Sequence, residues 1–450
     1  MMLKTPELLL PAGSLEKMRY AYLFGADAVY AGQPRYSLRA RNNEFRLEQL
    51  EIGIREAHAL GKKFFVASNL MPHNAKVKTY LADMVPVIAL SPDALIMADP
   101  GLIMMVREKW PEVPIHLSVQ ANTVNYATAK FWRTLGLTRI ILSRELSLAE
   151  VEEIRQQCPD IELEVFVHGA LCIAYSGRCL LSGYFNHRDP NQGTCTNSCR
   201  WDYQVHNADE DASGDIQKIQ FDFRAAMEET SFADCGQQTR HPLADKLYLI
   251  EEAQRPDELM PIMEDDHGTY IMNSKDLRAV EHVERLTKIG VDSLKIEGRT
   301  KSGYYVARTA QVYRQAIDDA VAGRSFDTRL LGALEGLANR GYTDGFYQRH
   351  HTEEYQNYLR GHSESSRSQY VGDIVAYDAA TGLAEITVKN RFQIGDRLEI
   401  LHPGGNRVLS LTRLFNQDSQ ALEVAPGSGH RVYIPMDTDL TPGLVTRFLN

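Results

Sequence analysis

The sequence predicts a (β/α)8 barrel of the TIM type followed by a small all-β domain, and three observations carry this prediction. Short, continuous apolar runs alternate with amphipathic stretches over roughly the first third of the chain, as expected for parallel strands covered by helices. A further apolar run follows a long interruption and completes the eight strands that close a barrel. Near the C-terminus the apolar pattern changes to period two, which is typical of antiparallel strands.

The eight predicted barrel strands are continuous apolar runs with glycine or proline at several of their ends. They lie at 7–10, 27–31, 63–68, 93–98, 115–119, 139–143, 162–167 and 291–298. The amphipathic stretches predict helices at 14–24, 46–60, 147–157, 275–288 and 304–322. An open doubly wound sheet is the alternative architecture, but eight regularly spaced units favour the barrel.

Changes in the pattern predict the domain boundaries. The barrel domain spans residues 1–360, with a cysteine-bearing insertion at 170–270 after the seventh strand. Within this insertion, 246–251 and 269–273 are expected to pair as a hairpin. A polar linker at 361–369 then leads to a small β-barrel at 370–450, with strands in YVGDIVAYD, LAEITVK, DRLEILH, VLSLTRLF and RVYIP.

The composition indicates a soluble globular protein. Of the 450 residues, 44% are hydrophobic, which is enough for a sizeable core. The N-terminal apolar run is too short for a membrane span, so we expect a cytoplasmic protein with no membrane partner. A formal net charge of -10 argues against a broadly basic surface for nucleic acid, although local basic patches remain compatible with RNA binding.

Four cysteines, Cys172, Cys179, Cys195 and Cys199, lie close together directly after the predicted seventh strand. In a reducing compartment such a group is more typical of a soft-metal site than of disulfides. No tight Cys-x-x-Cys pair is present, which favours an iron–sulfur cluster over structural zinc. Cys235 lies in the same insertion and is the alternative to a late cysteine as ligand, and four buried structural thiols are the non-functional alternative.

Polar side chains follow the C-terminal ends of the predicted strands, where barrel enzymes place their reactive groups. His168 and Glu297 are the candidate catalytic residues, although a lone histidine at a strand end is more often structural. Arginine, lysine and amide side chains there suit carboxylate or phosphate ligands. The candidate substrate-binding residues are Arg35, Arg39, Arg41, Asn69, Gln120, Arg144, Lys295 and Arg299.

The chain lacks the usual hydrolase motifs. It contains no Gly-x-Ser-x-Gly elbow, no His-Glu-x-x-His helix and no Walker loop, so serine or zinc proteolysis and ATP hydrolysis are disfavoured. A metal- or thiol-dependent peptidase and a non-catalytic, zinc-stabilised assembly factor remain the alternatives to a redox or oxygen-transfer role for the cysteines.

Several blocks resemble a known family. PELLLPAGS, GADAVYAG, EVFVHGALCIAYSGRCLLS, NSKDL and SLKIEGRTKSGYYVA are similar to blocks of peptidase family U32, often described as collagenase-like. AGQPRYSLRARNNEF, SVQANTVN and GRCLLSGYFNHRDPNQGTCTNSCRWDY resemble the members of that family that act in tRNA hydroxylation. The C-terminal segment resembles the accessory domain of the same family.

The resemblance implies an enzyme that hydroxylates carbon five of the wobble uridine in the tRNA anticodon, giving 5-hydroxyuridine. It also implies an oxygen-independent reaction, linked to the dicarboxylate prephenate, and an iron–sulfur cluster, expected to be of the four-iron four-sulfur type. The implied cluster ligands are Cys172, Cys179, Cys195 and, in the fourth position, Cys199 or Cys235. Some relatives carry a cysteine just after the NSKDL block, where this chain has Arg278. Lys389, Arg391 and Arg397 of the C-terminal barrel are expected to help bind RNA.

Overall fold

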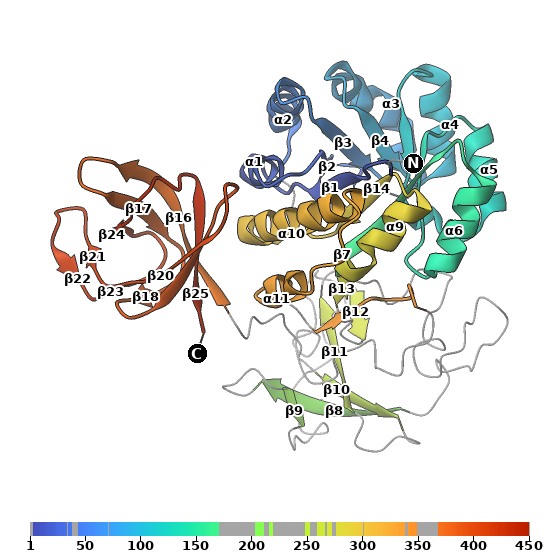
Figure 1. The fold of residues 1–450 in the computed structure, drawn as a ribbon. Helices are drawn as coiled ribbons and strands as arrows, with labels where there is room; N and C mark the ends of the chain where they lie inside the picture. The colour runs from blue at the N-terminus through green and yellow to red at the C-terminus, as the bar shows by residue number, and fades with distance from the viewer. Residues whose placement is uncertain are drawn as a thin grey trace, which may run out of the picture.

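A computed structural model shows a parallel barrel, an inserted antiparallel sheet and a separate all-β domain (Figure 1). It describes residues 3–33, 35–37, 44–70, 72–170, 203–210, 216–218, 248–252, 259–265, 268–271, 276–299, 301–337, 341–348 and 368–449. The four clustered cysteines, Cys235, Arg39 and Arg41 lie outside the described residues.

Eight parallel strands close the barrel, as the sequence predicts. They are β1 (Glu7–Pro11), β2 (Ala28–Gly32), β3 (Lys63–Ser68), β4 (Ala94–Met97), β5 (Ile115–Leu117), β6 (Arg139–Ile141), β7 (Glu162–Ala170) and β14 (Ser293–Ile296). Each strand pairs with the next in this order, and β14 pairs with both β7 and β1, which closes the ring. Nearly every strand residue is buried, because side chains fill the barrel on one face and helices cover the other.

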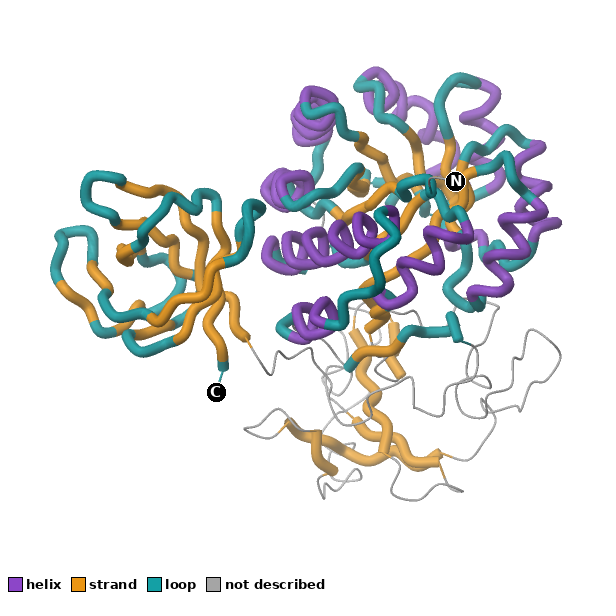
Figure 2. Tube along the Cα trace, in the orientation of Figure 1, coloured by secondary structure: helices purple, strands orange, loops and turns teal. Residues whose placement is uncertain are grey.

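Helices surround this barrel (Figure 2). They are α1 (Leu15–Leu23), α2 (Leu47–Ala59), α3 (Asn74–Ala89), α4 (Pro100–Lys109), α5 (Tyr126–Thr134), α6 (Leu148–Gln157), α9 (Val283–Ile289), α10 (Gly303–Val321) and α11 (Arg329–Glu335). Five of them, α1, α4, α5, α6 and α10, begin at a side chain that accepts one of the first free N–H groups. The Ser147 hydroxyl accepts from Glu150 N, and the Glu150 carboxylate accepts from Ser147 N in return.

The inserted strands form an antiparallel sheet, and here one prediction was wrong. β8 (Tyr203–Glu210), β9 (Ile216–Lys218), β10 (Tyr248–Glu252), β11 (Leu259–Asp265) and β12 (Gly268–Ile271) lie in the order β12-β11-β10-β8-β9. The segments that we expected to pair directly, β10 and β12, are separated by β11. The hydrophobic pattern did not identify β11, because its sequence LMPIMED contains a proline and two acidic residues, which are more typical of loops.

The predicted helix at 275–288 is also only partly correct. Its first residues form β13 (Asp276–Arg278), which pairs antiparallel with the end of β7 and parallel with β15 (Tyr342–Thr343). A 3-10 turn, η6 (Val280–His282), then leads into α9, which begins at Val283. The backbone of β7 extends beyond its partner β6 and leaves unpaired groups, so pairing with β13 overrides the local helical pattern.

The C-terminal domain is antiparallel. Its strands are β16 (Ser368–Asp378), β17 (Leu383–Val388), β18 (Phe392–Gln393), β19 (Arg397–Leu401), β20 (Arg407–Ser410), β21 (Leu414–Phe415), β22 (Ala421–Leu422), β23 (Val424–Ala425), β24 (Arg431–Pro435) and β25 (Gly443–Phe448). The larger sheet has the order β20-β19-β25-β16-β17-β24-β21-β22. Strand β25, which the sequence analysis did not identify, lies inside this sheet between β19 and β16. Strand β16 begins at Ser368, inside the expected linker.

This domain packs against α1 and α10 of the barrel (Figure 1). The Arg308 guanidinium of α10 forms an ion pair with Glu399 of β19, and Nη1 lies 3.2 Å from Oε1. The rings of Tyr304 and Tyr370 stack in parallel, with centroids 5.6 Å apart. Leu444 of β25 is fully buried and belongs to the hydrophobic core of the barrel domain. Polar and apolar contacts together therefore hold the two domains in one arrangement.

Candidate functional site

A network of buried charges lies within the barrel. Arg139 of β6 is 2% exposed, and its Nη1 donates to Glu7 Oε1 at 2.6 Å and to Glu164 Oε2 at 3.0 Å. Lys295 of β14, also buried, donates from Nζ to Glu164 Oε1 at 2.7 Å. Glu164 thus neutralises part of both cations, which is the condition under which buried charge is tolerated.

The side chain of Lys295 is enclosed within this network. Its Nζ lies 4.3 Å from the centroid of Tyr30 and 5.4 Å from that of Phe166, so two rings and one carboxylate surround the ammonium group. Burial lowers the pKa of Lys295, opposed by the charge of Glu164. Substrate binding by Lys295 stays a prediction, and its enclosure favours packing of the barrel interior instead.

Strand β7 contains a β-bulge near its end. Lys295 of β14 is opposite Phe166, but the next residue, Ile296, is opposite His168, so Val167 is an extra residue. Because side chains alternate along a strand, one extra residue reverses the side to which the following side chain points. Phe166 therefore faces Lys295 in the interior, whereas His168 faces away from it.

The surroundings of His168 agree with this reversal. Its ring lies between tyrosines of α10 and β15, with centroid distances of 5.7 Å to Tyr305, 5.6 Å to Tyr313 and 5.6 Å to Tyr342. The sequence analysis placed His168 at the barrel mouth as a catalytic residue. The structure corrects this placement, because the bulge turns the ring toward the helix that covers the barrel.

The environment also keeps His168 neutral. Burial lowers the pKa of His168 to about 3, and the charges of Arg278 and Lys301 act in the same direction. The nearest hydrogen-bonding group to Nδ1 is the hydroxyl of Tyr313, at 3.3 Å. A histidine with so low a pKa is a weak proton acceptor near neutral pH, so its position and its pKa both favour a structural role.

Tyrosine hydroxyls fix the C-terminal ends of β7 and β14. Tyr347 donates to Phe166 O at 2.6 Å, and Tyr313 donates to Val167 O at 2.7 Å. Tyr305 donates to Glu297 O at 2.8 Å. These residues were missed by the sequence analysis, although Tyr305 and Tyr313 are eight residues apart, which places them on one face of a helix. They hold the backbone from which the mouth side chains project.

At the mouth, the structure brings together two of the predicted residues. Arg144, which follows β6, lies with its guanidinium carbon 3.8 Å from the centroid of the Phe166 ring. Its Nη2 is 3.6 Å from Oε2 of Glu297, which follows β14. The side chains are 11% and 13% exposed, so this cation and this carboxylate are shielded but reachable. We call Arg144, Phe166 and Glu297 the mouth cluster.

Arg299 lies near the same end of the barrel. Its side chain is buried, with the guanidinium carbon 6.0 Å from the centroid of Tyr30. A Cβ atom on Gly32 would lie 2.5 Å from Arg299 Nη1, so a larger residue at the end of β2 would displace this guanidinium from its observed position. The predicted substrate-binding role of Arg299 is compatible with this position.

The other predicted binding residues are more scattered. Gln120 lies in the 3-10 turn η2 (Val119–Ala121), and its Oε1 accepts from the Ser118 hydroxyl at 3.4 Å. Asn69 directly follows β3 and is partly buried. Arg35 is exposed and forms an ion pair with Asp83 of α3 at 2.7 Å, so its contact is with a neighbouring helix. Their roles in binding stay predictions.

The predicted metal site has no counterpart in the part of the chain that the structure describes. No group of three or more His, Cys, Asp or Glu side chains there is arranged to hold a metal ion. Cys158, at the end of α6, is buried, and burial raises the pKa of its thiol. The iron–sulfur ligands therefore stay a prediction from the sequence. No helix among the described residues has the length and hydropathy needed to span a membrane.

Comparisons with known proteins place the chain in a family. The sequence profile of Peptidase family U32 matches residues 13–357, and that of the Peptidase family U32 C-terminal domain matches residues 366–447. tRNA hydroxylation protein P of Escherichia coli (strain K12) is 62% identical over 435 residues, which cover 97% of this chain and 94% of the relative. tRNA hydroxylation protein P of Haemophilus influenzae (strain KW20) is 58% identical over 446 residues, with 99% and 96% coverage.

Solved structures show a weaker similarity. The structure of a U32 peptidase is 16% identical and covers 43% of this chain and 84% of its own, with a TM-score of 0.33. The family assignment therefore depends on the sequence profiles and on the two bacterial relatives, which match at high identity over nearly the whole chain. The expected resemblance is confirmed: the chain belongs to peptidase family U32.

Proposed function

We propose that this protein is an enzyme that hydroxylates tRNA, at carbon five of the wobble uridine. One observation carries the proposal: the 62% identity to tRNA hydroxylation protein P of E. coli extends over 97% of this chain and 94% of the relative. Such identity over both domains supports a shared substrate and reaction. The wobble position and carbon five come from the family resemblance and belong to the proposal alone.

The barrel mouth has properties that suit an anionic RNA substrate. A uridine must leave the anticodon stack before an enzyme reaches its ring, and enzymes hold such bases against planar side chains. The guanidinium of Arg144, lying over Phe166, offers a planar cation at this end of the barrel. Glu297, the carboxylate that the sequence predicts to be catalytic, lies beside it.

The proposed cofactor is a four-iron four-sulfur cluster. Cys172, Cys179 and Cys195 would be three ligands, with Cys199 or Cys235 as the fourth. When bound, such a cluster would supply electron transfer, or it would position an oxygen donor. Replacing the hydrogen on carbon five with a hydroxyl group adds oxygen to the ring carbon and removes two electrons from it. The reaction therefore needs a co-reactant that both supplies oxygen and accepts two electrons, and we propose prephenate as this co-substrate or as its precursor.

Nucleoside analysis of tRNA tests the proposed function. A deletion strain grown without oxygen removes any parallel oxygen-dependent route, so we expect 5-hydroxyuridine and its derivatives to disappear from its tRNA. The gene on a plasmid should restore them. Unchanged modification in the anaerobic deletion strain would reject the proposal. A strain that is unable to make prephenate should lose the same nucleosides, and their persistence there would reject the prephenate link alone.

Anaerobic purification tests the cluster and its fourth ligand. We expect a brown protein that contains iron and sulfide, and we expect Cys172→Ser to lose both. Parallel measurement of Cys199→Ser and Cys235→Ser distinguishes the two candidates, because only the true ligand is needed for full iron content. A colourless protein with stoichiometric zinc would instead support the alternative of a zinc-stabilised assembly factor.

The family name keeps peptidase activity as the second candidate function. Incubation of the purified protein with gelatin tests it, and we expect no cleavage. Metal-dependent cleavage that disappears in Cys172→Ala would overturn our preference for tRNA hydroxylation. Cleavage that persists in this variant would point to a contaminating protease.

A further inference from the structure

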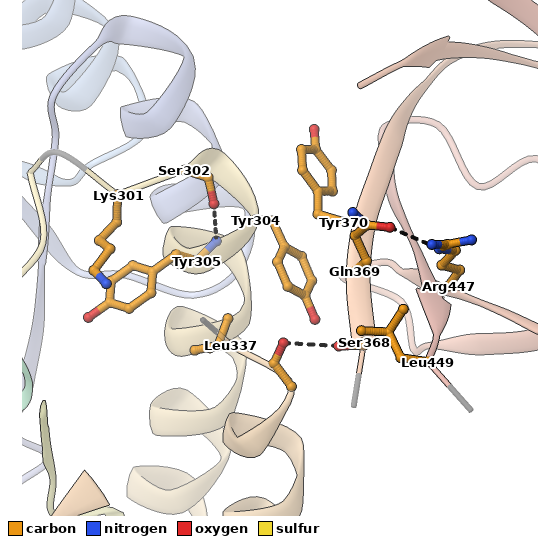
Figure 3. Close-up of a pocket in the computed structure, with 11 residues that line it drawn as sticks. Lys301, Ser302, Tyr304, Tyr305, Leu337, Ser368, Gln369, Tyr370, Arg447 and Leu449 are labelled. Atoms are coloured by element: carbon orange, nitrogen blue, oxygen red, sulfur yellow. Dashed lines mark hydrogen bonds between the residues drawn. The ribbon is translucent and has the colours of Figure 1, made fainter. Parts of the chain in front are cut away.

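A cavity of about 360 Å³ lies between the barrel and the C-terminal domain (Figure 3). It is separate from the mouth cluster. One wall comes from the start of α10 and the segment before it, and the other comes from β16 and β25. The lining includes Lys301, Tyr304 and Tyr305 on the barrel side and Gln369, Tyr370 and Arg447 on the other.

The lining combines cations with aromatic rings. Lys301 Nζ lies 5.6 Å from the centroid of Tyr305, and Arg447 Nε donates to Gln369 Oε1 at 2.9 Å. Among the residues that the structure describes, the cavity lining includes no aspartate and no glutamate. Arg447 Nη1 lies 3.7 Å from a carboxylate oxygen of Asp396. A cavity with two cations and several tyrosines suits a ligand that is both anionic and planar.

Both walls are held in place before any ligand binds. The Ser302 hydroxyl caps α10 by accepting from Tyr305 N at 3.2 Å. Across the domain boundary, the Ser368 hydroxyl donates to Gly336 O at 2.9 Å, a contact visible in Figure 3. The parallel rings of Tyr304 and Tyr370, tilted by only 3°, join the two walls. Binding at such a site costs little ordering of side chains.

The cavity adjoins the end of the barrel that carries the mouth. Lys301 lies in the segment between β14 and α10, and Tyr305 lies in the first turn of α10. The Tyr305 hydroxyl donates to the backbone of Glu297, a member of the mouth cluster. An RNA strand that delivers a base to the mouth therefore passes close to the cavity. The volume of about 360 Å³ is at the lower end of small-ligand sites, which suits one nucleotide.

We propose that this interdomain cavity binds one nucleotide of the tRNA substrate, next to the uridine that enters the barrel mouth. Lys301 on one wall and Arg447 on the other supply the positive charge that attracts its phosphate (Figure 3), and its base lies against a tyrosine ring of the wall. The proposal rests on tRNA being the substrate, and it gives the C-terminal domain a defined part in binding it.

Equilibrium binding of an unmodified tRNA transcript tests the proposal. The double variant Lys301→Gln/Arg447→Gln removes both cations of the cavity. Its charge-matched control is Lys288→Gln/Arg431→Gln, which alters two exposed residues, on α9 and β24, outside the cavity lining. We expect the cavity variant to raise the Kd for tRNA at least about tenfold, and the control to change it less than about twofold.

Salt dependence adds a readout that a loss of stability would not produce. Losing one phosphate contact should reduce the slope of log K against log salt by about 0.7 in the cavity variant alone. A second variant, Leu449→Trp, fills the cavity and keeps both cations, and it should also weaken tRNA binding. Circular dichroism melting checks that each variant is folded.

The outcomes separate this proposal from the proposed function. If both cavity variants bind tRNA as tightly as the native chain, which still hydroxylates tRNA, the nucleotide site is wrong and the function stands. If they lose only the binding of free uridine monophosphate, the cavity is a small-molecule site and the proposal is also overturned. A native chain with no affinity for tRNA would reject the proposed function as well.

Discussion

In the barrel interior, Arg139 and Lys295 share the buried carboxylate of Glu164 at distances of 3.0 Å and 2.7 Å. At the mouth, Arg144 lies 3.6 Å from Glu297, and both side chains keep part of their surface exposed. Similar charged residues thus form tight, enclosed pairs in one region and a looser, reachable pair in the other. The difference indicates that the interior charges stabilise the barrel, whereas the charged groups of the mouth cluster lie where a substrate can reach them.

The largest expected effect is on the interior network. Arg139→Met removes the cation and leaves the carboxylates of Glu7 and Glu164 with weaker pairing, so we expect it to reduce the free energy of unfolding by about 3–5 kcal/mol. Urea unfolding measures this loss. Arg133→Met, which breaks an exposed ion pair with Asp160, is the control and should cost less than about 1 kcal/mol. If Arg139→Met and Arg133→Met reduced the free energy of unfolding equally, burial would not explain the strength of the interior ion pairs.

Replacing Lys295 tests whether this residue belongs to the buried interior or to the substrate-binding site at the mouth. Lys295→Met leaves Glu164 paired with Arg139, so we expect a smaller loss of stability, about 2 kcal/mol, with the Km for tRNA unchanged. Urea unfolding and steady-state hydroxylation measure the two quantities. If the variant is as stable as the native chain but binds substrate poorly, Lys295 belongs to the binding site, as the sequence analysis predicted.

His168 should make stability depend on pH. Its folded pKa of about 3 lies below the usual value of 6.5, so below pH 6.5 the unfolded chain binds a proton that the folded chain does not. The free energy of unfolding then falls as the pH falls from 6.5 toward 3, by up to about 1.4 kcal/mol per pH unit. His168→Phe removes this contribution, so its stability should decrease less than that of the native chain between pH 7 and pH 5. If the free energy of unfolding falls equally in the two chains between pH 7 and pH 5, the low pKa of His168 would be contradicted.

The smallest effect is expected for Arg35. Its ion pair with Asp83 is exposed, so Arg35→Gln should change the free energy of unfolding by less than about 0.5 kcal/mol. Because Arg35 pairs with a neighbouring helix rather than with the mouth cluster, we expect the tRNA hydroxylation activity of the variant to stay within about twofold of the native value. A large loss of activity without a loss of stability would extend the functional surface to this side of the barrel.

Much of the fold was predictable, because parallel barrel strands are continuous apolar runs that local sequence identifies. Strand β13 was not predictable, because the local pattern of Asp276–Arg278 is that of a helix. The segment becomes a strand by pairing with the end of β7. The sequence analysis also missed the side to which His168 points, because this depends on the bulge at Val167. Gly169, with a φ of 104°, is a local sign of such an irregularity that the strand pattern alone did not reveal. The structure brings Arg144 and Glu297 together because they lie just beyond the ends of β6 and β14, whereas their roles in binding and catalysis stay predictions.

The most direct test of the account is the modification state of tRNA in the anaerobic deletion strain carrying either Arg144→Gln or Arg35→Gln. We predict that the Arg144 variant, with a melting temperature close to that of the native chain, forms 5-hydroxyuridine at a rate reduced roughly 100-fold, while the Arg35 variant restores this modification fully. Full restoration by a stable Arg144 variant would contradict the claim that the mouth cluster is the site of tRNA hydroxylation.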